Sequence, residues 1–440
     1  MKKIVYFAFT IFLLIGGCSK ENPINDPIND PIIEQSGTVD HPYLIKTKQD
    51  LMQVRDRVNY DNANYPNKVY KLMSDLDFTG EPCWIPIGSS TVPFQGIFDG
   101  NGKVIKNIKI GIEIKQVNIF HIGLFGYASG AEIKNLGVQC SIVNDSYNSF
   151  IGGIVGYVTD TNITNCYSSG TISCRESASS DVGGIAGYEK KSCISNCYST
   201  CSLLGSFVGG ICGESEGTIS ICYSSGYISG TFVGGIAGIA AKIINCYSAA
   251  SVVAYYPHDQ YVGGIAGMAN SIINCYSTGN ISGSYVGGIA GSAANIINCY
   301  SSGDISSIAP DYSNISLGGI AGEILSSSYS NLALNKNLMS ICNYDWSNTY
   351  INRISGTSNI CTALNNFASS TMIVKKGRSE STLTTITDFS NIKNHGSDLI
   401  DSPVNLLNNY VVANPTYEGI SLLKWKAELG VNNGFPIFLN

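Results

Sequence analysis

The chain has 440 residues, a formal net charge of -6 and only 13% charged residues, with 48 glycines. Such a mildly acidic, weakly charged chain lacks the lysine and arginine surface that neutralises phosphates, so nucleic acid is excluded as a partner. Length alone would fit two or three globular domains, but internal repetition overrides that estimate.

Residues 1–17 have the order of a secretory signal peptide. Lys2 and Lys3 precede an apolar run over residues 4–15, and two glycines then lead to Cys18. The apolar run is too short for a comfortable transmembrane helix. The sequence therefore predicts export from the cytoplasm and removal of residues 1–17.

The residues Ile15-Gly16-Gly17-Cys18 resemble the lipobox of bacterial lipoproteins. The resemblance implies that the Cys18 sulfur receives a diacylglycerol and that the freed amine is acylated. Two or three acyl chains hold a protein durably, since each buried methylene contributes about 0.8 kcal/mol. We expect a bacterial envelope protein attached through Cys18 to the outer membrane or cell surface, the alternative being an ordinary signal with an incidental cysteine.

Residues 18–36 are polar and contain Pro23, Pro27 and Pro31, which predicts an extended, flexible linker behind the lipid. Residues 37–112 follow as an amino-terminal cap with the first repeats. Within them, Thr47-Lys48-Gln49-Asp50 precedes Leu51, Val54 and Val58, the spacing of a capped amphipathic helix. Such a helix would cover an exposed sheet edge.

Residues 113–322 are a series of repeats, each with two blocks. The first block centres on Gly-Gly-Ile-Ala-Gly, and the glycine before its branched residue recurs after 31, 26, 25, 29, 24 and 31 residues. These glycines are Gly153, Gly184, Gly210, Gly235, Gly264, Gly288 and Gly319. A fixed motif at variable steps indicates loops of variable length on a regular coil.

The second block reads as a strand that turns a corner. In Ile272-Ile273-Asn274-Cys275-Tyr276-Ser277 we place the first isoleucine inside and the second outside. Asn274 breaks the alternation, and asparagine tolerates left-handed backbone and forms hydrogen-bonded ladders, so it predicts a corner. After the corner the cysteine points inward, the tyrosine outward and the serine inward.

Such short, glycine-rich blocks bury too little surface alone, but stacking at about 4.8 Å pairs their strands and continues the core. The predicted fold is all-β, a parallel β-helix (β-solenoid) of roughly eight or more coils with capping segments. Beyond Gly322 the glycine pattern stops, so residues 323–440 are interpreted as carboxy-terminal coils or a cap.

Gly123-Leu124-Phe125-Gly126, with Phe94-Gln95-Gly96-Ile97-Phe98-Asp99-Gly100-Asn101-Gly102 upstream, resembles the GLUG-motif repeat family of bacterial surface proteins. The resemblance covers about residues 37–345, although Gly-Gly-Ile-Ala-Gly largely replaces Gly-Leu-x-Gly. It implies surface display and adhesion, sometimes as an accessory part of a larger secreted protease.

Six cysteines share one repeat position, three residues after the inner isoleucine. They are Cys166, Cys197, Cys222, Cys246, Cys275 and Cys299. Stacked coils would bring neighbouring α-carbons near 5 Å, within disulfide range, but a small buried thiol packed between isoleucines is the favoured interpretation. One thiol per coil forms a line rather than a tetrahedron, so no metal site is predicted.

No catalytic set is apparent in the linear sequence. The four histidines are not in a zinc-protease arrangement. Pectin lyase-like β-helix enzymes gather carboxylates on one face, whereas these fall at different repeat positions: Asp160, Asp181, Glu189, Glu214, Asp259 and Asp304. We therefore expect no enzymatic activity, catalytic residue, metal or cofactor.

The tyrosine after each cysteine is the clearest candidate for a binding surface. Stacked coils would align Tyr167, Tyr198, Tyr223, Tyr247, Tyr276 and Tyr300. Exposed aromatic patches bind proteins or sugars, but ring packing between strands is a structural alternative. The leading hypothesis is a surface module for adhesion to a glycan or protein; a polysaccharide lyase or hydrolase and a structural envelope spacer are the alternatives.

Overall fold

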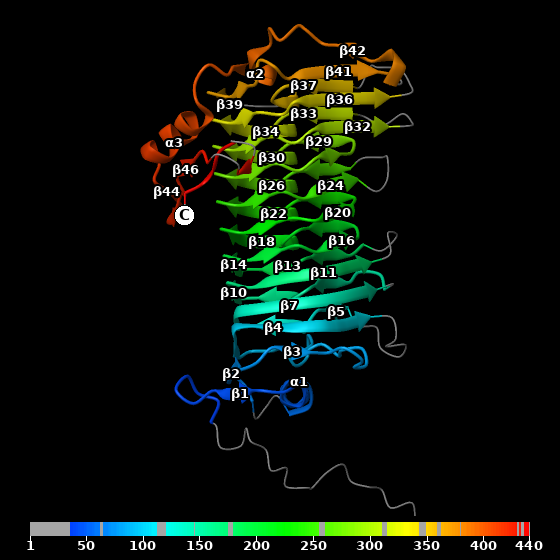
Figure 1. Cartoon of the computed structure of the whole chain (residues 1–440), viewed down its shortest axis with the longest axis vertical. Helices are drawn as coiled ribbons and strands as arrows, with labels where there is room; N and C mark the ends of the chain where they lie inside the picture. Colours follow the sequence, from blue (N-terminus) through cyan, green and yellow to red (C-terminus); the bar gives the residue numbers. More distant parts are fainter. Residues whose placement is uncertain are drawn as a thin grey trace, which may run out of the picture.

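The computed structural model describes residues 36–61, 65–111, 120–144, 146–174, 179–254, 260–309, 315–342, 349–358, 362–378, 380–428, 431–432 and 435–439. These form a parallel β-helix in which successive coils stack along one axis (Figure 1). The strands belong mainly to a nine-stranded and a 34-stranded sheet. The predicted all-β parallel β-helix is confirmed.

The nine-stranded sheet precedes the Gly-Gly corners. It comprises β5 (His121–Ile122), β8 (Phe150–Gly152), β12 (Asp181–Gly183), β17 (Phe207–Gly209), β21 (Phe232–Gly234), β25 (Tyr261–Gly263), β29 (Tyr285–Gly287), β33 (Ile315–Gly318) and β37 (Thr349–Asn352).

The next face begins after the glycines and ends at the asparagine corner. Its strands are β6 (Phe125–Ser129), β9 (Val155–Thr159), β10 (Asn162–Thr164), β13 (Ala186–Lys190), β14 (Cys193–Ser195), β18 (Cys212–Ser220), β22 (Ala237–Ile244), β26 (Ala266–Ile273), β30 (Ala290–Ile297), β34 (Ala321–Tyr329), β38 (Ser355–Ser358) and β39 (Thr362–Leu364).

The strands that carry the tyrosines follow the corner, and a further short strand ends most coils. They are β11 (Tyr167–Cys174), β15 (Tyr198–Ser199), β16 (Ser202–Leu204), β19 (Tyr223–Ser224), β20 (Tyr227–Gly230), β23 (Tyr247–Ser248), β24 (Ser251–Ala254), β27 (Tyr276–Ser277), β28 (Ile281–Ser282), β31 (Tyr300–Ser301), β32 (Ile305–Ala309), β35 (Leu332–Ala333), β36 (Asn337–Cys342), β40 (Phe367–Ala368) and β41 (Ile373–Gly377). The long β7 (Glu132–Asn144) spans both faces of an early coil.

Glycine is required where adjacent coils turn together. A Cβ on Gly264 would lie 2.3 Å from the Gly288 carbonyl oxygen and 2.1 Å from Ser277 Oγ. No side chain fits at that separation, so the Gly-Gly pair permits the coils to stack at the strand spacing.

The predicted asparagine corner is confirmed. Asn165, Asn196, Asn245, Asn274 and Asn298 have φ between 52° and 55°, in the left-handed region. Their side-chain amides bond along the stack, as in the 2.7 Å bonds from Asn274 to Asn245 and from Asn298 to Asn274. We call Asn135 and these five residues the asparagine ladder.

The core contains the residues that the repeat placed inside. Ile243, Ile272 and Ile296 are fully buried, and so are the six cysteines that share one repeat position. The cysteines are free thiols, and from Cys197 onward each Sγ accepts the backbone N–H of the preceding coil's cysteine, as Cys275 Sγ accepts the Cys246 N–H at 3.4 Å. This is the packed-thiol arrangement rather than the disulfide alternative.

The amino-terminal end carries the predicted helix. Strands β1 (Tyr43–Ile45), β2 (Val69–Leu72), β3 (Leu76–Asp77) and β4 (Ile97–Gly111) build this end, with α1 (Lys48–Asp61) beside them (Figure 1). Asp50 Oδ2 accepts the Lys46 and Thr47 N–H groups at 2.9 Å, and Thr47 Oγ1 accepts the Asp50 N–H at 3.2 Å. This reciprocal cap fixes the helix start.

Coils continue past Gly322, since β36 pairs in parallel with β41 although the glycine motif has ended. The chain then forms a 3₁₀ turn (Glu380–Thr382), β42 (Thr384–Thr385), α2 (Ile392–His395) and β43 (Ser397–Asp398). Residues 399–439, here called the C-terminal lobe, contain α3 (Pro403–Ala413), β44 (Thr416–Tyr417), β45 (Ile420–Ser421), β46 (Trp425–Lys426) and β47 (Ile437–Phe438). This lobe turns back along the side of the coils (Figure 1).

In the part of the chain that the structure describes, no helix has the length and hydropathy to span a bilayer. The signal peptide, Cys18 and the linker lie outside the described residues.

Candidate binding groove

The six predicted tyrosines form one continuous stack, here called the tyrosine column. Each tyrosine is paired in register with the tyrosine of the next coil. Neighbouring ring centroids are 4.7 to 5.0 Å apart and the planes diverge by no more than 7°. The parallel register therefore sets the stacking directly.

Exposure along the tyrosine column is uneven, which corrects the expectation of a uniformly exposed stripe. Tyr167, Tyr198, Tyr223 and Tyr247 are partly exposed, but Tyr276 is 6% exposed and Tyr300 is fully buried. The C-terminal lobe covers these last two. The Trp425 ring lies 5.6 Å from that of Tyr300, and the Phe438 ring lies 5.3 Å from that of Tyr276.

The asparagine ladder also binds the lobe, through three main-chain groups and one indole N–H. Asn245 Nδ2 donates to the Ser421 carbonyl at 2.8 Å, and Asn245 Oδ1 accepts the Leu423 N–H at 3.1 Å. Asn274 Nδ2 donates to the Leu423 carbonyl at 2.9 Å, and Asn274 Oδ1 accepts the Trp425 indole N–H at 2.8 Å. The ladder therefore holds an extended segment of the same chain.

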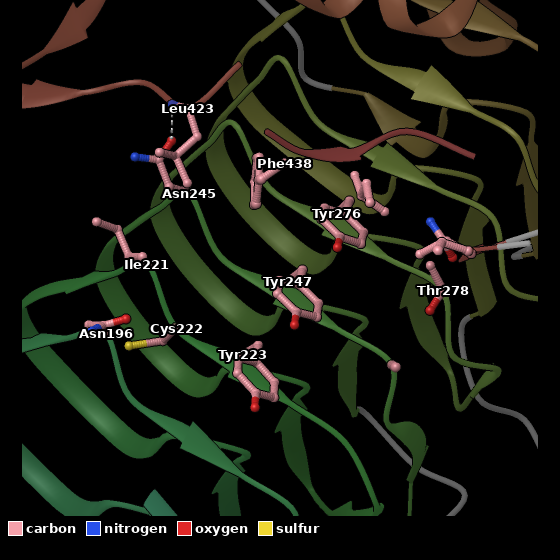
Figure 2. A pocket seen from close by; sticks show the side chains of 14 residues that line it. Asn196, Ile221, Cys222, Tyr223, Asn245, Tyr247, Tyr276, Thr278, Leu423 and Phe438 are labelled. Carbon is pink, nitrogen blue, oxygen red and sulfur yellow. Dashed lines mark hydrogen bonds between the residues drawn. The ribbon is translucent and has the colours of Figure 1, made fainter. Parts of the chain in front are cut away.

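A groove of about 540 Å³ opens where the lobe ends and the exposed coils begin. Figure 2 shows Tyr223, Tyr247 and Tyr276 in a row, with Phe438 of the lobe beside Tyr276 and Leu423 of the lobe next to Asn245. The lining is Asn196, Ile221, Cys222, Tyr223, Asn245, Tyr247, Ala249, Tyr276, Thr278, Leu423, Val431, Asn432, Ile437 and Phe438. Apolar walls with a few convergent amides and hydroxyls are typical of ligand sites.

Ile221 interrupts the asparagine ladder inside this groove. It has φ 54° and is 43% exposed, at the position that asparagine holds in neighbouring coils. A β-branched residue in left-handed backbone is strained by about 1 to 3 kcal/mol. The groove thus has an exposed apolar contact where the repeat would supply an amide.

The tyrosine hydroxyls of the groove keep their protons over the physiological pH range. Burial, with the neighbouring Tyr223, raises the pKa of Tyr247 to about 12, and burial also raises the pKa of Tyr276. These neutral hydroxyls can both donate and accept hydrogen bonds to a ligand.

Coil stacking buries Asp181 and places its backbone next to Gly213, the residue before Glu214. Asp181 is 7% exposed and stands between Phe150 and Phe207 in the register of the nine-stranded sheet. Burial, with the charge of Glu214, raises the pKa of Asp181 to about 8. The pKa of Glu214 is raised by burial and by the charge of Glu216.

The other predicted carboxylates are placed differently. Glu189 is buried, and its carboxylate accepts the Gly217 N–H at 2.8 Å. Asp160 and Asp304 are exposed, and Asp259 lies outside the described residues. Within those residues, no three histidine, cysteine or acidic side chains are grouped to hold a metal ion.

A second tyrosine stack was missed by the sequence analysis. Tyr127, Tyr157 and Tyr188 stack with ring centroids 4.8 and 5.0 Å apart. The signal was present, since each follows the last glycine of its motif. It ends at Glu214, which replaces tyrosine in the next coil's register.

Comparison with solved structures found four matching chains, of which two are described here. One, described as a candidate immunoglobulin A1 protease from Bacteroides ovatus, is 22% identical, with 91% of this chain and 93% of that chain covered and a TM-score of 0.38. The other, described as an IgA1 protease, is 15% identical, with 78% of this chain and 22% of that chain covered and a TM-score of 0.34. No curated protein matches this chain.

The protease names contradict the expectation that this chain is not an enzyme, and that expectation is withdrawn. Its physical basis was also incomplete, because a comparison of repeat positions does not show which carboxyl groups the stacked coils bury, as they bury Asp181. Likeness at these identities and TM-scores assigns no activity to this chain.

The family model described as the GLUG motif matches residues 147–173 and 282–306. The first match includes β8 and the second includes β29, both of which belong to the nine-stranded sheet. The chain is a β-helix that carries the GLUG motif of this repeat family.

Proposed function

We propose that this chain is a lipid-anchored protein of the bacterial cell surface that binds an external ligand in the groove beside the tyrosine column. The linker after Cys18 would hold the β-helix away from the bilayer and leave the groove accessible. The β-helix then serves as a rigid support that keeps the aromatic rings in register.

The observation that carries this proposal is the groove itself. It combines three stacked tyrosines, amides from the asparagine ladder and the apolar edge of the lobe in about 540 Å³. Aromatic rings with hydroxyls supply contact area at low conformational entropy, which is the composition of many recognition surfaces. The strained, exposed Ile221 in its floor agrees with a functional role.

Tyr223→Ser with Tyr247→Ser is expected to abolish ligand binding while the chain stays folded, because each lost ring pair costs about 0.2 to 1 kcal/mol. Binding of the purified full chain to arrays of glycans and extracellular proteins is the measurement. The control is Tyr127→Ser with Tyr157→Ser, which removes stacked rings from the second tyrosine stack. Equal loss in both double variants would contradict a site in the groove.

Cys18→Ala is expected to leave a full-length precursor that takes up no labelled palmitate, because no thiol remains to receive the lipid. Ser19→Ala, one residue further, should label and fractionate as the unaltered chain does. Unchanged labelling of the Cys18 variant would refute the anchor.

A further inference from the structure

The lobe reveals what chemistry the asparagine ladder recognises. A primary amide has two N–H donors and two acceptor lone pairs. Asn274 uses one of each within the ladder, to Asn245 and from Asn298, and one of each on the lobe segment. One donor and one acceptor per asparagine are thus directed outward from the stack.

Three of the four bonds to the lobe segment engage its main chain. Asn245 contacts both peptide groups that flank Leu422, donating to the carbonyl before it and accepting from the N–H after it. The Leu422 side chain is 6% exposed, and Trp425 packs on the column. Main-chain bonds with aromatic and aliphatic anchors are how extended peptides are recognised.

The same arrangement recurs, uncovered, three coils earlier. By register, Asn165 and Asn196 correspond to Asn245 and Asn274, and Tyr198 and Tyr223 correspond to Tyr276 and Tyr300. Both asparagines have the same left-handed backbone and are exposed, and Asn196 Nδ2 lies 3.5 Å from Asn165 Oδ1. This uncovered site is continuous with the surface that holds the lobe.

We infer that the uncovered site, formed by Asn165, Asn196, Tyr198 and Tyr223, binds an extended peptide segment of another protein. The asparagines bond to its main chain, and the tyrosine rings receive an aromatic or aliphatic side chain. This inference rests on the proposed binding function and names the ligand class of the surface that adjoins the groove and shares Asn196 and Tyr223 with it.

The flanking residues explain why the lobe occupies the later coils and leaves this site accessible. The outward position before the asparagine is Ile244, Ile273 or Ile297 beneath the lobe. In the earlier coils the same position is Thr164, Ser195 and Ser220. The uncovered site offers less apolar area, so its ligand would exchange, whereas the lobe stays attached.

The test uses a fluorescent synthetic peptide with the sequence of residues 419–426, which contains the segment that the ladder already holds. Fluorescence anisotropy with the purified full chain is expected to show saturable binding. Asn165→Gly with Asn196→Gly should weaken it about tenfold or more, because two or more hydrogen bonds are lost. Glycine keeps the left-handed backbone without strain, and thermal melts confirm that the variant is folded.

A peptide N-methylated at the Leu423 position lacks one main-chain donor and should also bind at least about tenfold more weakly. Tyr127→Ser with Tyr157→Ser should bind as the unaltered chain does. Equal binding by the glycine variant or by the methylated peptide overturns the inference. If glycans bind in the groove and the peptide does not, the inference fails and the proposed function stands; if nothing binds, both fail.

Discussion

Ile272→Asp is expected to unfold several coils. Ile272 is fully buried in the stack between Ile243 and Ile296 of the adjacent coils. The substitution removes about 1.5 to 3 kcal/mol of apolar burial and places a carboxyl group in the core with no charged partner. Thermal unfolding followed by circular dichroism should show loss of the folded baseline or a strongly lowered midpoint.

Ser271→Asp is the matched control, since it lies on the same strand and faces outward. Ser271 is partly exposed and pairs in register with Lys242 and Asn295. Its substitution should change the free energy of unfolding by no more than about 0.5 kcal/mol. Equal melting of the two variants would mean that the inner and outer faces are wrongly assigned.

Asp181→Asn is expected to change how stability depends on pH. The pKa of Asp181 is raised to about 8, whereas an unfolded aspartate has a pKa of about 3.9. Between these values the folded chain keeps a proton that the unfolded chain releases. The contribution of protonated Asp181 to the free energy of unfolding is therefore complete below about pH 4, falls as the pH rises and is lost above about pH 8.

Asparagine does not titrate, so the variant should gain stability relative to the unaltered chain across this window, by on the order of 5 kcal/mol at most. Denaturant unfolding at pH 4.5, 6 and 8.5 measures the difference. Glu189 and Glu214 also have raised pKa values, but they are present in both chains. A difference that is constant with pH would show that Asp181 titrates normally.

The repeated part of the fold was predictable because the same residue pattern recurs in successive coils. Ile272 at 0% exposure, the left-handed Asn274 and the buried Cys275 agree with the faces predicted from side-chain alternation. A residue that recurs at one repeat position has the same backbone conformation and points to the same side of the coil each time, so the sequence constrains its orientation several times over. The stacking of Tyr276 on Tyr300 follows from the same register.

The cover over the tyrosine column was not predicted, because it is not periodic. Residues 421–425 contact Asn245 and Asn274 across about 150 to 180 positions of the chain. A signal did exist, in the change from Thr164, Ser195 and Ser220 to Ile244, Ile273 and Ile297 at one outward position. An outward position that becomes apolar over successive coils indicates that another element packs there.

The proximity of Asp181 to the strand that carries Glu214 was missed for a different reason. Asp181 and Glu214 occupy different positions within their repeats, so their linear spacing gave no hint of proximity. The tight Gly-Gly corner places the start of β12 beside β18 of the next coil, where a Cβ on Gly213 would lie 2.8 Å from the Asp181 carbonyl carbon. Sites built across a corner from two coils are hidden from a search by repeat position.

The C-terminal lobe changes how the β-helix unfolds. In a simple array each repeat contacts only its neighbours, so the ends fray and unfolding proceeds one unit at a time. Here one short segment bonds to Asn245 and Asn274 and packs on Tyr300, and so joins three successive coils through a part of the chain outside them. Opening any one of these coils also disrupts the lobe, which makes residues 245–300 a single cooperative unit. Native-state hydrogen exchange should therefore give the backbone amides of these coils one common free energy of opening, while the coils before residue 220 open in smaller steps.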